Sequence, residues 1–123
     1  MSSTVAELQL PPADRRPFAD RRPWFTPDSL DNLHGPRSGL VWVSAHINTA
    51  PEPVYNFDDP AELRAGYSAI VQEAIPGEHE WLLDKELLLK LWPDLFLPRQ
   101  CRAVWIAKFP EELGSLPVRA LSL

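Results

Sequence analysis

The side chains that could carry out catalysis or bind a metal are few and lie far apart along the chain. The three histidines are at positions 34, 46 and 79, and no two of them have the i, i+4 or short-loop spacing of metal ligands. His46 stands out because Ser44 is two residues away, on the same expected strand face. A serine nucleophile also needs an oriented base and an oxyanion donor, and no acid adjoins this pair in the sequence. We therefore expect a protein that is not an enzyme, with no catalytic residue, no metal ligand and no cofactor.

The paired acids and the single cysteine have structural interpretations. Asp58–Asp59 precede an expected helix, where carboxylates bind free N–H groups and complement the helix dipole. Glu78, Glu80 and the pair Glu111–Glu112 are expected in solvated turns. Cys101 is expected on the buried stripe of a helix, where a thiol behaves as a small hydrophobe. A lone cysteine forms no internal disulfide, which favours a reducing, cytoplasmic location.

Composition indicates one small globular domain. The chain has 123 residues, of which 45% are hydrophobic and 24% charged, as is ordinary for a folded domain. The formal net charge of −5 opposes non-specific binding to nucleic acid. No apolar run is long enough to predict a membrane span. Fourteen prolines against five glycines predict short elements with abrupt ends.

The elements that would position the polar side chains indicate an α+β fold. Residues 41–47 alternate between apolar and polar side chains, which predicts a half-buried strand, and residues 54–57 form a shorter partner. Together they predict a β-hairpin from about residue 40 to residue 57. Because an isolated hairpin is marginal in water, helices or another chain must cover its apolar face.

Three or four short helices are expected between residues 59 and 109. Asp59 followed by proline predicts a helix start, and Pro76-Gly77 predicts its end. A break is expected before Asp84, which would cap the start of a second short helix. Residues 99–109 are expected to form the last helix. The apolar stripes of these helices predict a common core of Leu91, Trp92, Leu95, Val104 and Trp105. Trp81, Trp92 and Trp105 are expected as its aromatic anchors.

The two ends of the chain are expected to lie outside the domain of residues 26–110. Residues 1–25 lack periodicity and are predicted to form a flexible arm, and residues 111–123 a disordered tail. Within the arm, Ala13-Asp-Arg-Arg-Pro-Phe18 is followed at once by Ala19-Asp-Arg-Arg-Pro-Trp24. This doubled hexapeptide is either a slippage duplication or a peptide that docks on a partner, since arginine and aromatic residues dominate binding hot spots.

Two surfaces are candidates for binding. Trp24 and Trp42 are harder to bury than the other tryptophans, and Trp42 shares its strand face with His46, so we predict that these three residues bind a partner. The alternative surface is the last helix, where Arg99, Gln100 and Arg102 could contact DNA. The connector before that helix is longer than the three or four residues, roughly, of a helix-turn-helix.

Several segments carry a resemblance to a known group of proteins. They are Gly35–Val41, Tyr55–Pro60, Tyr67–Ala74 and, above all, Asp84–Trp105 with its Leu-Trp-Pro-Asp-Leu core at residues 91–95. Over roughly residues 33–110 the chain resembles short actinobacterial proteins labelled transcriptional regulators or uncharacterised. It is similar to the small partners encoded beside nucleotidyltransferase-fold toxins of the abortive-infection type. It departs from that pattern at residues 45–53.

The resemblance implies a non-enzymatic, antitoxin-like interaction protein that restrains a nucleotidyltransferase-fold partner. A DNA-binding transcriptional regulator that uses the last two helices is the alternative. The first expectation places the functional surface on the hairpin, and the second places it on the last two helices.

Overall fold

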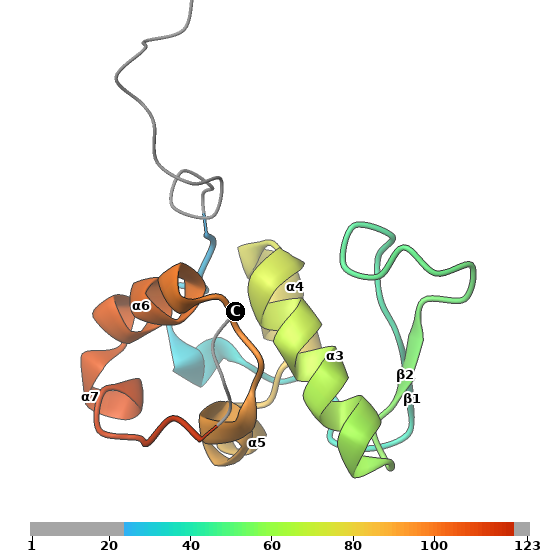
Figure 1. Ribbon diagram of the computed structural model, residues 1–123. Coiled ribbons are helices and arrows are strands. Elements are labelled where there is room, and N and C mark those ends of the chain that lie inside the picture. Colours follow the sequence, from blue (N-terminus) through green and yellow to red (C-terminus); the bar gives the residue numbers. More distant parts are fainter. Residues whose placement is uncertain (1–23, 120–123) are drawn as a thin grey trace, which may run out of the picture.

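A computed structural model describes residues 24–119 and has an α+β fold, which confirms the expected class (Figure 1). In chain order the elements are η1 (Leu30–Asn32), β1 (Leu40–Trp42), β2 (Val54–Asn56), α3 (Pro60–Glu73), α4 (Pro76–Leu82), α5 (Lys85–Leu91), η2 (Trp92–Asp94), α6 (Arg99–Lys108) and α7 (Pro110–Leu113), where η denotes a 3-10 helix. Four α-helices, α3 to α6, lie between residues 59 and 109, within the expected number, and the described residues add a further helix, α7, after them. None of the described helices is long and apolar enough to cross a membrane.

The hairpin is antiparallel, with Val41 opposite Tyr55. Its inner face packs on α3, where Gly66 leaves room for the rings of Tyr55 and Phe57: a Cβ at this position would lie 3.0 Å from an atom of each ring. Val41 and Phe57 are buried. The helix that the isolated hairpin needs is therefore α3.

The first strand is shorter than expected. It ends at Trp42, and a turn follows in which the Ile47 N–H donates to the Ser44 carbonyl at 2.9 Å. Val43 and Ile47 are buried as the alternation predicts, whereas Ala45 is exposed because it lies in the turn.

Local capping chemistry sets the helix starts. The Asp59 carboxylate accepts from the Ala61 N–H at 3.0 Å, and Pro60 takes the first position of α3. The Asp84 carboxylate accepts from the Leu87 N–H at 3.0 Å, so the predicted break before α5 is confirmed. Pro76-Gly77 opens α4 as well as ending α3, since proline suits a first helical turn.

The core forms around two tryptophans whose rings pack against each other at a tilt. Trp92 and Trp105 are fully buried with ring centroids 6.1 Å apart, and Leu95 is buried beside them. The prediction for Val104 is wrong, because this side chain is 37% exposed. Arg102 takes the position on the buried face of α6 that the sequence pattern gave to Val104.

The domain extends beyond residue 110, so the predicted boundary there is wrong. Leu113 in α7 is fully buried, because Pro110 starts another helical turn that returns the chain to the core. The Arg119 N–H then donates to the Pro93 carbonyl at 2.7 Å, and Figure 1 shows this last segment running back past α5. At the other end, Trp24 packs partly buried against the core. The predictions for residues 1–23 and 120–123 lie outside the described residues.

Candidate functional site

A hollow of about 490 Å³ opens between α4 and the end of β1. One wall is made by residues 42–44, and the other by residues of α4 and its N-terminal flank. The residues of that second wall are Ile75, Gly77, Glu78, Trp81 and Leu82.

Three large apolar side chains stand exposed at this hollow. Trp42 is 59% exposed, Trp81 72% and Ile75 49%. Trp42 faces outward because the pleat of β1 places its neighbour Val41 in the core. Apolar side chains gathered around a concavity are typical of a binding surface. We call these three residues the Trp42–Trp81 face.

The prediction that Trp81 anchors the core is wrong. His79 occupies the core position of α4 instead and is fully buried. Two residues correspond to about 200° around a helix, so a buried His79 turns Trp81 outward.

The polar part of the hollow is centred on Glu78. Its Oε2 accepts from the Ser44 hydroxyl at 2.7 Å, and its Oε1 lies 2.7 Å from His46 Nε2. Oε1 also accepts from the Ile75 N–H at 3.1 Å, which ties the side chain to the start of α4. Burial raises the pKa of Glu78, but the hydrogen bonds from Ser44, the Ile75 N–H and His46 together outweigh it and lower the pKa below its ordinary value. The carboxylate is therefore held ionised.

This arrangement is a structural hydrogen-bond cluster rather than a catalytic triad. We call the contacts of Glu78 with Ser44 and His46 the Glu78 latch. The structure supplies the acid that the sequence does not place beside Ser44 and His46. In a triad, however, the imidazole stands between the hydroxyl and the acid, so that it can take the hydroxyl proton. Here the Glu78 carboxylate bonds to both side chains, and its hydrogen bonds hold the turn after β1 against α4. The expectation that Glu78 lies in a solvated turn is therefore wrong, because its side chain is hydrogen-bonded within the site.

Trp42 and His46 come together at this site. Trp42 lines the hollow, and His46 contacts Glu78 in the latch. Trp24 does not line the hollow. It is the first described residue and packs partly buried against the core.

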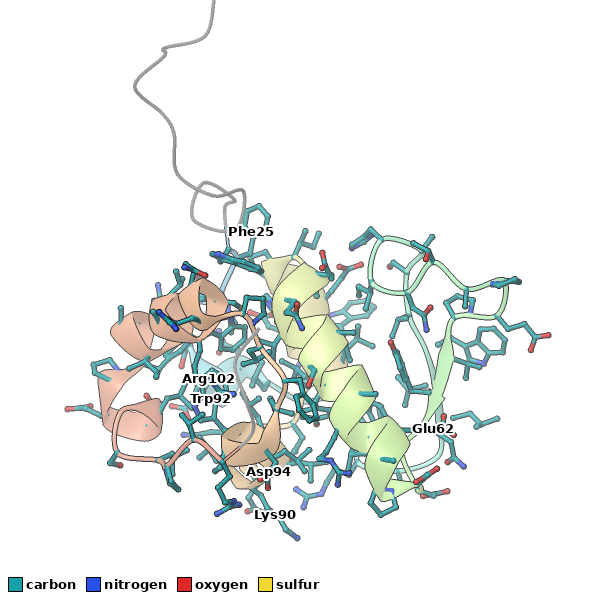
Figure 2. All side chains as sticks on the ribbon, viewed as in Figure 1. Phe25, Glu62, Lys90, Trp92, Asp94 and Arg102 are labelled. Atoms are coloured by element: carbon teal, nitrogen blue, oxygen red, sulfur yellow. The ribbon has the colours of Figure 1, made fainter. Side chains whose placement is uncertain are left out.

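The residues proposed for DNA contact are not displayed together. Arg99 is exposed and Gln100 partly so, but Arg102 is only 5% exposed, and its assignment as a DNA-binding residue is wrong. Figure 2 shows Arg102 beside Trp92 in the interior between α5 and α6.

Arg102 ties α6 to the connector that precedes it. Its Nη1 donates to the Trp92 carbonyl at 3.1 Å and its Nη2 to the Leu95 carbonyl at 2.5 Å. Its guanidinium carbon lies 4.9 Å from the Trp92 ring centroid, within the range of a cation–π contact. Burial lowers the pKa of Arg102. An arginine exposed for contact with DNA would not be desolvated in this way.

Among residues 24–119, no group of three or more His, Cys, Asp or Glu side chains is placed to hold a metal ion. Comparison with protein-family models, with curated proteins and with solved structures finds no match to this chain.

Three residues of the site were missed by the sequence reasoning, namely Ile75, Glu78 and Trp81. A signal for Glu78 exists. Proline at the first position of a helix and glutamate at the third are typical of a helix N-terminus whose glutamate reaches back to the cap N–H. No comparable signal predicts that Trp81 faces outward, because this depends on His79 being buried.

Proposed function

We propose that this chain is a non-enzymatic interaction domain that binds a protein partner through the Trp42–Trp81 face. The observation that carries the proposal is two exposed indole rings lining one hollow whose wall is held by the Glu78 latch. Tryptophan is enriched among the residues that dominate binding energy, and a preorganised wall reduces the ordering cost of association.

The partner that the sequence resemblance favours is a nucleotidyltransferase-fold toxin, which this chain would restrain as an antitoxin. Charge supports that choice. Residues 24–119 carry 14 acidic side chains against eight Lys and Arg, and an enzyme that handles nucleotides needs cationic groups around phosphate. An acidic domain is complementary to such a surface, which favours fast association.

The alternative, a DNA-binding regulator, has less support. Arg102 is committed to the interior, which leaves Arg99 and Gln100 on the first turn of α6. A net charge of −5 further opposes binding to a polyanion.

The proposal is tested with Trp42→Ala, Trp81→Ala and the double variant. Each single change should weaken binding to a nucleotidyltransferase-fold protein of the same genome by about 2 kcal/mol or more, roughly 30-fold. Folding stability should change by no more than about 0.5 kcal/mol, because both rings are largely exposed. Calorimetric titration measures the affinity, and rescue of growth on co-expression measures restraint of the toxin.

Phe96→Ala is the matched control, since Phe96 is an aromatic residue 51% exposed that does not line the hollow. It should bind as the unmodified chain does. Full affinity in the double tryptophan variant would overturn the proposal. So would tight binding to DNA that is lost in Arg99→Ala and kept in Trp42→Ala.

A further inference from the structure

We propose that the first N-terminal hexapeptide, residues 13–18, docks in the hollow of its own chain and covers the Trp42–Trp81 face until a partner displaces it. The docking is argued from observations that are independent of the proposed function. That the docked segment inhibits binding of a partner rests on the proposed function.

One copy of the repeat already ends on this domain. Trp24, the last residue of the second hexapeptide, packs partly buried against the core. The first hexapeptide has the same sequence apart from its final aromatic, Phe18, six residues upstream. A peptide whose aromatic residue seats on the domain in one copy has the composition to do so in the other.

The first repeat is long enough to reach the hollow. Figure 1 shows the described chain beginning at the end of the molecule where α3 ends and α4 starts, and α4 forms one wall of the hollow. Six residues span up to about 20 Å when extended. A domain of this size has a radius of gyration of about 12–13 Å. A linker of this length is therefore sufficient for Phe18 to reach the α4 side of the molecule without displacing Trp24.

The hollow and the repeat are complementary in chemistry. The apolar walls offer Ile75 and two indole rings to Phe18, and indole faces also bind guanidinium groups. Glu78 is held ionised and its Oε2 accepts a single hydrogen bond from the protein, so it retains capacity for an arginine.

Charge on the wall favours the same occupant. Glu78 is the acidic residue of the α4 wall, and helix α4 carries no lysine or arginine, while its histidine is buried. The repeat supplies Arg15 and Arg16, and Pro17 restricts the free peptide and so lowers the entropy lost on docking.

Because the repeat is tethered to the domain, a weak intrinsic affinity is sufficient to keep it docked most of the time. A short linker places the repeat at an effective concentration of about 1 mM. A peptide with an intrinsic Kd of about 0.1 mM would then be docked roughly nine-tenths of the time, which slows cleavage of the docked segment about tenfold.

The experiment is limited trypsin digestion of the full chain at low enzyme concentration, followed by mass spectrometry. Trypsin cuts after Arg15, whereas the bond between Arg16 and Pro17 resists because of the proline. Cleavage after Arg15 should be about tenfold faster in Phe18→Ser and in Trp81→Ala than in the unmodified chain. Phe96→Ala should cleave at the unmodified rate.

Equal rates in all four proteins would overturn the proposal. Protection that increases with protein concentration would also overturn it, because the occupant would then be a second copy of the chain. Phe18→Ser remains informative even if Trp81→Ala fails to fold. No partner is used, so the docking can succeed where the proposed function fails. If both hold, Phe18→Ser should bind the partner about tenfold more tightly than the unmodified chain.

Discussion

His79 shows how a single residue can depart from the chemistry that its type suggests. The ring is fully buried and packs edge-on against Trp105, with centroids 5.0 Å apart. Neither ring nitrogen makes a hydrogen bond of good geometry. Burial lowers the pKa of His79 to about 4, and the carbonyl groups of Val71 and Ile70 offset only part of that effect. The residue therefore stays neutral at physiological pH and acts as a core side chain.

We predict that His79 makes folding stability depend on pH. The pKa of histidine is about 6.5 in an unfolded chain. Between pH 6.5 and about 4 the unfolded state consequently binds more protons than the folded state. The free energy of unfolding should fall as pH falls through this window, by about 3 kcal/mol in total. Urea unfolding at several pH values measures the slope.

His79→Leu should lose that part of the slope, whereas His34→Gln, a change at an exposed histidine, should keep it. The carboxylates of Glu78 and Asp94 also have lowered pKa values, so their contributions are lost only at lower pH. The same slope in His79→Leu as in the unmodified chain would contradict the assignment.

At the scale of the elements, the connection between α4 and α5 is tied to a distant segment. The His34 N–H donates to the Glu80 carbonyl at 2.9 Å, and the Gly35 N–H donates to the Leu83 carbonyl at 2.7 Å. A Cβ on Gly35 would lie 2.4 Å from the Leu82 carbonyl carbon, closer than backbone contact permits. Glycine is required here by close approach of two backbones, not by an unusual φ angle.

We predict that Gly35→Ala destabilises the fold by about 2–3 kcal/mol, because one of the two segments must move and strain both hydrogen bonds. Gly77→Ala is the matched control, since no heavy atom lies within 4 Å of a Cβ there. Its effect should range from neutral to about 1 kcal/mol of stabilisation, as alanine favours a helix. Thermal unfolding measures the midpoint temperatures of the two variants. Equal midpoints would argue against the close approach of the two backbones at Gly35.

At the scale of the whole described molecule, the C-terminal segment closes the core. Leu113 is fully buried, and the Arg119 guanidinium makes two hydrogen bonds of 3.0 Å to Asp94 in η2. Residues of α7 and beyond thus pack against the same core as α5 and α6.

We predict that Leu113→Ala costs about 2–4 kcal/mol, through lost burial and the cavity left behind. Arg119→Ala should cost much less, because its pair with Asp94 is at the surface and is screened by solvent. Denaturant unfolding measures both. A negligible effect of Leu113→Ala would mean that α7 does not contribute to the core.

Sequence patterns alone predicted those features that depend on a residue and its near neighbours. The α+β class, the hairpin and the helix starts at Asp59 and Asp84 follow from alternation, from proline's fixed φ angle and from carboxylates that accept backbone N–H groups. The burial of Trp92 and Trp105 follows from helical spacing.

The candidate site depended on contacts that local patterns do not contain. Glu78 meets Ser44 and His46 from more than 30 residues away in the sequence. Periodicity assigns faces by hydrophobicity and would bury Trp81 and expose Arg102. The tertiary structure reverses both, because His79 fills the core on α4 and two backbone carbonyls satisfy the buried guanidinium. Only the packing of distant segments determines which side chain has a partner inside the protein and which is left exposed to bind another molecule.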